Sequence, residues 1–379
     1  MNSQTIQYTK NNMKKSFYKS SLLFLLMGTT VAFTSCERGD DPIPDIPPSD
    51  GTELTLDGGE GGSSAANTVF VDLSADKQTS VKRTSWNLGF YNGSQFRVIL
   101  NNTAGASAVQ VNATDLNAVS ESDLNLDDLA IALGSPNAFD NIDDLTGDLS
   151  KTLIPEISST ADNNKVFVVN PVGGGHGDVI TADNLYKIRV IREGNDYVLQ
   201  YAKLNDTDFS TLTVKKDEEY NFNYVSFADG PLTVEPLKAE WDFQWTWSLY
   251  AGSMPNGDQY PYGYSDLIFI NHHAGVSAAE VVFEDTEGGS TGEPTYENFT
   301  EADLAGVNFD NTRGVIASNW RKTTGTPLGA QPDRFYLIKD GSGNVYKLRF
   351  TSMGAGDPPT DGGKRGYPEL EYKLVVRGN

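Results

Sequence analysis

The residues that could carry out chemistry are few and scattered along the chain. The sequence has three histidines, His176, His272 and His273, and one cysteine, Cys36, so it offers few general bases and nucleophiles. It contains no Gly-x-Ser-x-Gly elbow, no His-Glu-x-x-His pair, no phosphate-binding loop and no EF-hand spacing. Acidic residues are plentiful, but no two stand at a spacing that would pair them as in a glycoside hydrolase. The sequence therefore argues against an enzyme and favours a protein that binds its ligand without transforming it.

The single cysteine lies at the end of an apparent secretion signal. An apolar run over residues 22–27 follows three lysines and leads into small residues before Cys36. The run is shorter than the about 20 apolar residues that cross a bilayer. The tetrapeptide Phe33-Thr34-Ser35-Cys36 resembles the cleavage site of bacterial lipoproteins, in which the cysteine becomes the N-terminus and carries the acyl chains. We therefore expect a signal peptide over residues 1–35 and a lipid anchor on Cys36, rather than a free buried thiol.

Residues 36–67 have the composition of a tether. Acidic residues directly after Cys36 are similar to the tract that marks surface-exposed lipoproteins, although a solvated linker would have the same composition. A proline-rich stretch follows over residues 42–48, and such a sequence is stiff. After it, residues 58–64 are rich in glycine and serine, which makes a chain flexible. We expect a protein anchored by lipid to the outer membrane, exposed at the cell surface, whose folded part begins near Thr68.

The charge and the cysteine count exclude other classes. The formal net charge is −22, and phosphate binding needs a basic face, so nucleic acid is not the expected partner. One cysteine cannot form an internal disulfide, a zinc ribbon or an iron–sulfur site. The length of 379 residues is sufficient for two packed domains.

Collinear repeats indicate a duplication. The segments 85–90 and 240–245 both centre on a tryptophan followed by Asn or Asp, and three further landmarks recur in the same order. These are Asn101 to Ala108 with Asn271 to Ala278, Ser120 to Leu124 with Thr300 to Leu304, and Tyr186 to Arg189 with Tyr346 to Arg349. We therefore predict two repeated domains, over residues 68–219 and 220–379.

Each predicted domain is rich in strands. Apolar residues alternate over 96–100 and 186–191, and Glu193-Gly194-Asn195-Asp196 reads as a hairpin turn before the next apolar run. The acidic segments after Ser120 and Thr300 have the composition of a capped first helical turn. The predicted fold class is all-β, mainly an antiparallel β-sandwich, with short helical insertions.

These motifs together resemble the HmuY family of haem-binding lipoproteins, over roughly residues 68–376. The resemblance implies an all-β protein that takes haem from a host carrier and passes it to an outer-membrane TonB-dependent receptor. Haem is the only cofactor that it implies. The motifs that carry it are Val71-Asp72-Leu73-Ser74, Trp86-Asn87-Leu88-Gly89-Phe90, Phe96 to Asn101, the Tyr-Lys-(Ile/Leu)-Arg strands, Tyr224-Val225-Ser226-Phe227, Val234-Glu235-Pro236, Trp241-Asp242-Phe243 and Ile270-Asn271.

The resemblance also implies axial ligands for the haem iron, which family members supply as His or Met side chains in loops. The candidates in the second domain are Met254, His272, His273 and Met353, and the candidate in the first is His176. A histidine in a glycine-rich loop, as His176 is, is more often a solvated residue than a ligand, with the glycines serving as turn formers. Because neighbouring strand residues point to opposite faces, we expect at most one of His272 and His273 to face a given pocket. Met254 and Met353 stand outside apolar runs, which favours loops over the core for both.

Aromatic and basic residues complete the expected site. The row Trp241, Phe243, Trp245 and Trp247 is expected to face the core of a sandwich. Tyr260, Tyr262 and Tyr264 lie in a Pro/Gly-rich stretch that we interpret as a loop, where they could stack on a porphyrin. They could equally contact a sugar ring or a protein, so the alternative function is a surface lipoprotein that binds glycan or protein and no haem. Lys364 and Arg365 are the basic residues that we expect to meet haem propionates.

Overall fold

Short apolar segments form strands, and all pairings between the described strands are antiparallel. The computed structural model describes residues 47–131, 139–173, 179–254, 256–285, 288–356 and 359–378. Pro47–Asn379 belong to one compact unit. The expectation that residues 36–67 are a tether and that the folded part begins near Thr68 is wrong, because Glu53–Thr55 pair with residues 369–371 and Leu56 is fully buried in the core. Within the described ranges the helices are short 3₁₀ segments, η1 (Gly62–Ser64), η2 (Leu116–Ala118), η3 (Glu121–Asp123), η4 (Leu126–Leu129), η5 (Leu149–Lys151), η6 (Ala161–Asn163), η7 (Ala182–Asn184), η8 (His272–Ala274) and η9 (Glu301–Gly306).

The first sandwich packs a five-stranded sheet against a four-stranded one. The larger sheet has the order β10-β9-β8-β7-β6, and the smaller has the order β12-β11-β4-β5. Their bounds are β4 (Leu88–Tyr91), β5 (Val98–Leu100), β6 (Ser107–Val111), β7 (Val166–Asn170), β8 (Tyr186–Glu193), β9 (Asp196–Lys203), β10 (Ser210–Val214), β11 (Phe222–Ser226) and β12 (Gly230–Leu232). Phe90 and Val98 of the smaller sheet share one buried cluster with Phe167, Ile188 and Leu199 of the larger.

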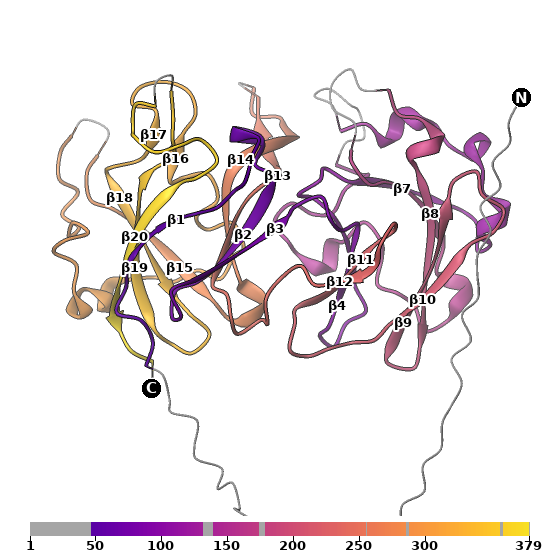
Figure 1. The fold of residues 1–379 in the computed structure, drawn as a ribbon, viewed down its shortest axis with the longest axis horizontal. Helices are drawn as coiled ribbons and strands as arrows, with labels where there is room; N and C mark the ends of the chain where they lie inside the picture. Colours follow the sequence, from indigo (N-terminus) through magenta and orange to yellow (C-terminus); the bar gives the residue numbers. More distant parts are fainter. Residues whose placement is uncertain are drawn as a thin grey trace, which may run out of the picture. The chain divides into compact units, whose positions relative to one another are not determined.

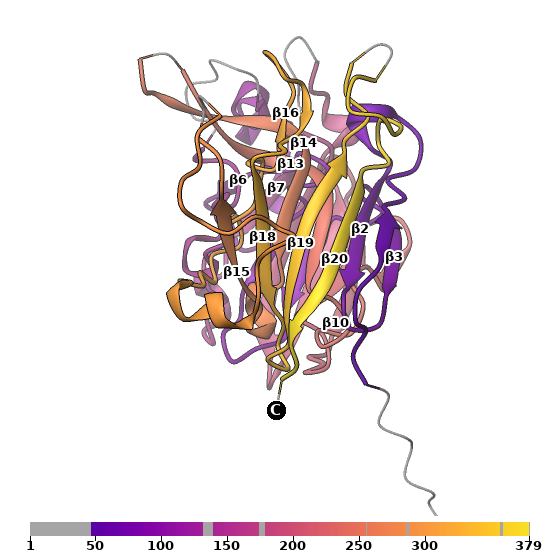
Figure 2. The same ribbon diagram turned by 90° about the vertical axis from the view of Figure 1, so that its left-hand side faces the viewer.

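The second sandwich has the same composition of sheets. Its larger sheet has the order β1-β20-β19-β18-β15, its smaller sheet has the order β14-β13-β2-β3, and a two-stranded ribbon β16-β17 stands beside them. Figure 2 shows β18, β19 and β20 side by side. The bounds are β1 (Glu53–Thr55), β2 (Asn67–Asp72), β3 (Lys77–Lys82), β13 (Phe243–Ser253), β14 (Gln259–Ile270), β15 (Ser277–Val282), β16 (Arg321–Lys322), β17 (Gly329–Ala330), β18 (Arg334–Lys339), β19 (Val345–Ser352) and β20 (Glu369–Val376).

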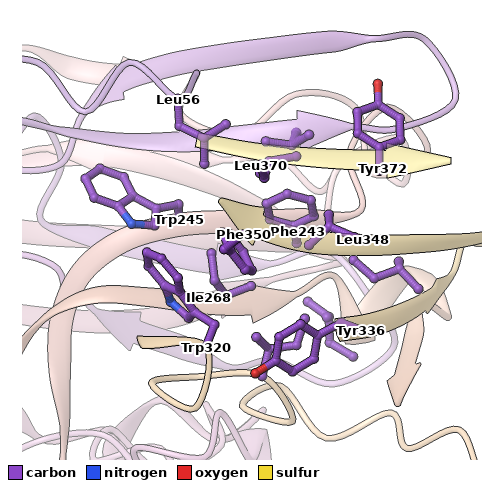
Figure 3. Packing of buried hydrophobic residues seen from close by; sticks show 14 of the residues in the cluster. Leu56, Phe243, Trp245, Ile268, Trp320, Tyr336, Leu348, Phe350, Leu370 and Tyr372 are labelled. Carbon is purple, nitrogen blue, oxygen red and sulfur yellow. The ribbon is translucent and has the colours of Figure 1, made fainter. Parts of the chain in front are cut away.

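The largest side chains of the second sandwich meet between its two sheets (Figure 3). Phe243 and Trp245 of β13 are fully buried against Tyr336 and Phe350 of the facing sheet, and Trp320 packs on Phe350 at 4.2 Å between ring centroids. Burying one such side chain contributes about 1.5–3 kcal/mol. The predicted core role of the tryptophan-rich strand is confirmed for these residues, and the all-β prediction with short helical insertions is confirmed for the fold.

Two hairpins pair with strands on the other side of the predicted domain boundary, which lies between residues 219 and 220. The β2–β3 hairpin, which precedes that boundary, pairs through β2 with β13 of the second sandwich. The β11–β12 hairpin, which follows it, pairs through β11 with β4 of the first sandwich. Figure 1 shows both hairpins beside their partners. Each sandwich therefore contains one hairpin from the other side of the predicted boundary. The duplication stays a prediction from the sequence.

One repeated motif, the asparagine at the end of a strand, forms the same hydrogen bonds in both sandwiches. The Asn101 side-chain amide donates hydrogen bonds to the carbonyls of Arg83 and Trp86. The Asn271 amide donates in the same way to Lys238 and Trp241, at 2.9 Å each. Each asparagine therefore ties the end of one strand to the turn before its neighbour, which explains why this pair of motifs recurs.

The other repeated motif joins a buried lysine to a capped helix. Asp303 accepts hydrogen bonds from the backbone N–H and hydroxyl of Thr300, and Asp123 does so from Ser120. These contacts confirm the predicted capped turns. Lys347 is 7% exposed and donates to the carbonyls of Tyr296 and Phe299 just before η9. Its ammonium is tolerated inside the protein because these carbonyls satisfy it.

Candidate functional site

The β13–β14 hairpin extends past the sheet that anchors it. β2 pairs with β13 only at Phe243 to Trp245, and a bulge between Thr246 and Ser248 follows. We call the part beyond the bulge, residues 248–254 and 256–264, the arm. Here β13 and β14 pair only with each other, from Ser248 with Tyr264 to Ser253 with Gln259.

One face of the arm is a row of tyrosines. Tyr260, Tyr262 and Tyr264 have ring centroids 6.0 and 5.4 Å apart, and Tyr250 lies 5.7 Å from Tyr264. Tyr262 is 52% exposed, whereas the other three are partly buried. We call these four side chains the tyrosine face. They form a continuous aromatic surface that is open to solvent at its centre.

The interpretation of this stretch as a loop is wrong, because Tyr260, Tyr262 and Tyr264 belong to strand β14. Their spacing of two residues is that of side chains on one face of a strand. Pro261 is tolerated because β14 is the edge strand of its sheet, where a missing N–H costs no ladder bond.

Two glycines of the arm make room for its aromatic rings. Gly252 stands opposite Tyr260, and a Cβ at Gly252 would lie 2.7 Å from the Tyr260 ring. On the other face, a Cβ at Gly263 would lie 2.2 Å from the Trp247 ring. Trp247 and Leu249 pack there against Ile131, Ile142 and Leu145 of the first sandwich. The arm therefore packs against the first sandwich on the side of Trp247, and its tyrosine side is open to solvent.

Two arginines meet at the inner end of the tyrosine face. The Nη2 atom of Arg365 lies 2.5 Å from Asp266 Oδ2 and 3.0 Å from Ser265 Oγ, and Nη2 of Arg321 lies 2.5 Å from the Ser265 carbonyl. Asp266 is 1% exposed and has a φ of 57°, a left-handed conformation that is unusual outside glycine. The Arg321 guanidinium carbon lies 6.0 Å from the Tyr264 ring. We call Arg321 and Arg365 the arginine pair.

The two predicted basic residues, Lys364 and Arg365, have different surroundings. Arg365 joins the arginine pair, whereas Lys364 is exposed and places its ammonium 4.0 Å from the Tyr367 ring. Arg321 was missed by sequence reasoning, since only the fold brings it beside Arg365. Burial lowers the pKa of Arg321, Asp266 partly offsets this, and Arg365 adds to the lowering.

The two methionine candidates lie in different surroundings. Met254 is partly exposed at the tip of the arm, where its N–H donates to the Asp258 carbonyl at 2.8 Å. Met353 is 2% exposed within the core of the second sandwich. The expectation that Met353 avoids the core is wrong, because Asp361 accepts hydrogen bonds from the N–H groups of Met353 and Ala355 and folds this segment inward.

The two histidines line a cavity at the other end of the β13–β14 hairpin. His272 and His273 follow β14 in η8, with ring centroids 3.8 Å apart, and both border a cavity of about 120 Å³. The expectation that only one of them faces a given pocket is wrong, because η8 turns both side chains the same way. Burial lowers the pKa of His272 to about 4 and of His273 to about 3, so both are neutral at pH 7.

This histidine cavity does not fit haem. Its volume is about 120 Å³, whereas pockets that enclose drug-sized ligands have volumes of about 300–1,000 Å³. Adjacent rings on one wall cannot reach opposite faces of a porphyrin. The 12 residues of β14 span roughly 35–40 Å, so Met254 and His272 cannot bind one iron either. The structure therefore brings Tyr260, Tyr262, Tyr264, Met254 and Arg365 to one arm and places the histidines elsewhere.

Two predicted residues, Cys36 and His176, lie outside the described residues. Among the residues that the structure describes, no group of three or more His, Cys, Asp or Glu side chains is placed to hold a metal ion. No helix in the described ranges is long and apolar enough to cross a membrane.

Comparison with known proteins gives one match. The model of the HmuY protein family matches residues 64–372, which is most of the chain. No curated protein and no solved structure matches.

Proposed function

Because the chain belongs to the HmuY family, which is known as a family of haem-binding proteins, we propose that it binds haem on the tyrosine face of the arm. In this proposal the chain is a surface lipoprotein that captures haem and releases it to a receptor. The observation that carries the choice of site is the continuous row of aromatic rings between Met254 at the tip and the arginine pair at the base.

The tyrosine face suits a flat apolar ligand. Aromatic side chains attract other ring systems through offset and edge-to-face contacts worth about 0.5–1.5 kcal/mol each beyond area burial. Three residues spaced by two cover roughly 13 Å along a strand, so one ligand can contact several rings at once. The brace of Trp247 and Leu249 on the far side holds this surface in place before the ligand arrives.

Met254 is the axial ligand that this placement favours. A thioether ligates haem iron in other proteins, and Met254 is the candidate that stands on the arm, two residues beyond Gly252, which pairs with Tyr260. A bound haem would supply an iron to which the Met254 sulfur can serve as a ligand. The tyrosine rings would hold the porphyrin and shield one of its faces from water. His176 remains a predicted second ligand.

The lipid anchor and the receptor complete the proposal. Cys36 carries the acyl chains, the residues between Cys36 and the folded part separate the membrane from the binding arm, and an outer-membrane TonB-dependent receptor accepts the haem that a host carrier supplied. An open binding surface suits transfer between proteins, since a ligand that is covered on one side only can be passed on without unfolding its site.

The proposed site is tested by haemin titration of single variants. Tyr262→Ala and Met254→Ala should each weaken haemin binding about tenfold or more, and Met254→Ala should also shift the Soret band. Phe209→Ala is the matched control for Tyr262, because Phe209 is also an exposed aromatic residue, 38% exposed, but stands before β10. His272→Ala should leave the spectrum unchanged. If instead His272→Ala abolishes binding and Tyr262→Ala does not, haem binds elsewhere.

A further inference from the structure

We propose that the histidine cavity is a second binding site, which takes a neutral molecule with one aromatic ring and a hydrogen-bond acceptor, such as an aromatic amide or a phenol. The inference goes beyond the binding of haem on the arm and does not depend on it. The two sites are separate, because this cavity does not fit a porphyrin and lies at the other end of the β13–β14 hairpin.

The histidine cavity lies where the outer faces of the two four-stranded sheets meet. In β13, Phe243 points into the core of the second sandwich, so its neighbour Gln244 points to the opposite face and borders the cavity beside Phe70 of β2. In β11, Val225 belongs to the core of the first sandwich, and its neighbour Tyr224 borders the cavity from the other side. Ligand sites occur preferentially at junctions of this kind.

Equivalent segments of both sandwiches build this cavity. Asn102 and Thr103 follow the repeated asparagine of the first sandwich, and His272 and His273 follow that of the second. All four residues border the cavity. The space is therefore enclosed by the two sandwiches together, and it is not a packing gap within either core.

The walls of the cavity are aromatic and the space between them has the size of one ring. The ring of Trp241 lies edge-on to Phe70 at 5.1 Å between centroids, and Trp86 lies edge-on to Tyr224 at 4.8 Å. An apolar cavity of about 150 Å³ accepts one benzene molecule, and this cavity has a volume of about 120 Å³. A single aromatic ring can thus pack here through the edge-to-face contacts that such rings prefer.

Arg313 is the strongest hydrogen-bond donor at the cavity. Its guanidinium carbon lies 3.8 Å from the centroid of the Phe269 ring, and its Nη1 atom reaches the Leu145 carbonyl only at 3.5 Å, the long limit of a hydrogen bond. Within the described residues Arg313 forms no ion pair. Burial lowers the pKa of Arg313 to about 10, so the group stays charged at pH 7. A guanidinium has five N–H donors, which leaves several for a ligand oxygen.

The other charged groups at the cavity favour a neutral ligand over an anion. Asp143, Asp144 and Asp148 border the cavity, and each already accepts a hydrogen bond from a backbone N–H. Both histidines are neutral at pH 7, and burial raises the pKa of Glu235 to about 8, so that carboxyl is mostly protonated. A ligand therefore meets one guanidinium and three carboxylates. The carboxylates would repel an anion, whereas an uncharged oxygen can accept from Arg313 without that repulsion.

Calorimetric titration of the purified full-length protein with benzamide tests the inference. Benzamide has one ring, a neutral amide oxygen and about nine non-hydrogen atoms, and a compound of this size should bind with a Kd of about 0.1–1 mM. Benzoate has the same shape and a negative charge, so it should bind at least about tenfold more weakly.

Two variants locate the site. Arg313→Met removes the donors and should weaken benzamide binding about tenfold. Leu149→Trp should abolish it, because Leu149 borders the cavity and a larger side chain would fill the space. Leu126→Trp is the matched control, since Leu126 is also a partly buried leucine of a 3₁₀ helix but packs in another cluster, and it should keep the affinity. Haemin binding should be the same in Leu149→Trp as in the unaltered protein.

Each contrary result overturns the inference and leaves haem binding on the arm untouched. No binding of benzamide up to about 10 mM would mean that the cavity holds water only. Tighter binding of benzoate than of benzamide would contradict a neutral ligand, and full affinity in Arg313→Met or Leu149→Trp would place benzamide elsewhere. If either variant fails to fold, a crystal of the unaltered protein soaked in benzamide decides the question. Density for the ring beside Arg313 would support the site, and a cavity without it would contradict the site.

Discussion

Asn271 shows how one repeated residue organises its surroundings. Its side chain is 1% exposed, donates to two backbone carbonyls and accepts a hydrogen bond from the Asn221 amide at 2.9 Å. It also precedes η8, so it fixes where the histidines begin. The recurrence of this asparagine in the sequence therefore marks a structural corner rather than a ligand site.

We expect Asn271→Ala to lower the free energy of unfolding by about 2–3 kcal/mol, since it leaves two buried carbonyls and one amide unpaired. Urea denaturation measures this change. Asn184→Ala is the control, because Asn184 is exposed and forms one side-chain bond, to Thr181. A difference below about 0.5 kcal/mol between the two variants would contradict the role given to Asn271.

Two buried carboxyl groups make stability depend on pH. Burial raises the pKa of Glu235 and of Asp242 to about 8 each, and backbone hydrogen bonds from Phe222 and Leu73 only partly offset this. In the unfolded chain both groups ionise near pH 4. Between pH 6.5 and 8 the folded protein therefore holds more protons, so raising the pH favours unfolding.

The free energy of unfolding should accordingly fall by about 1–2 kcal/mol per group between pH 6.5 and 8.5, and Glu235→Gln should remove the contribution of Glu235. His272 and His273 oppose a small part of this change up to about pH 7.5, because their imidazoles are neutral in the folded protein while those of the unfolded chain still lose protons near the ordinary pKa of 6.5. Stability that rises with pH over this interval, or an unchanged slope in Glu235→Gln, would refute the assignment.

Sequence reasoning succeeded for residues whose role follows from local pattern. Trp241, Phe243 and Trp245 alternate along a strand and are buried. It failed for Met353 and Arg321, whose surroundings come from segments distant in the chain, namely the Asp361 loop and the Ser265 corner. No local pattern reports such contacts.

At the scale of elements, the arm depends on close packing of glycine against aromatic rings. Trp247 lies against Gly263 across the hairpin and against Leu249 and Ile142 below it. The sequence suggested a loop here because proline and glycine interrupt the tyrosines. The stretch forms a strand nonetheless, since glycine opposite a large ring is favourable packing at a sheet edge.

Gly263→Ala should displace Trp247 and loosen the arm, because its Cβ would lie 2.2 Å from the indole ring. We expect haemin affinity to fall several-fold while the cores of both sandwiches stay folded, as read by titration and by circular dichroism. Gly306→Ala is the matched control, since nothing lies within 4 Å of a Cβ there. Equal haemin affinity in both variants would show that the arm does not form the binding surface.

For the whole molecule, the exchange of hairpins determines what can fold alone. β2 and β11 each complete a sheet on the far side of the predicted boundary, and Phe70, Trp86, Phe222 and Trp241 form one buried cluster between them. The alternation of apolar residues located the strands, but it could not show which strands pair with each other. The reason is that β2 and β13 lie about 170 residues apart, so their pairing depends on the assembled sheets.

A fragment of residues 47–219 should therefore fail to fold. It would contain β2 without β13 and β4 without β11, leaving unpaired strand edges and exposed aromatic residues. The chain of residues 47–379 should unfold in one cooperative transition. Circular dichroism and amide exchange of both species test this, and a stable, well-ordered fragment would contradict the pairing that the structure shows.

The most direct test of the central claim is a haemin titration of the full-length protein, followed in the visible spectrum in oxidised and reduced forms. The account places one haem on the single arm, so it predicts a sharpened Soret band that saturates at one equivalent and is lost in the Tyr262→Ala, Met254→Ala double variant. Only the weak, broad absorbance of free haemin would contradict haem binding and would leave a glycan or a protein as the ligand. Saturation at two equivalents would contradict the single site.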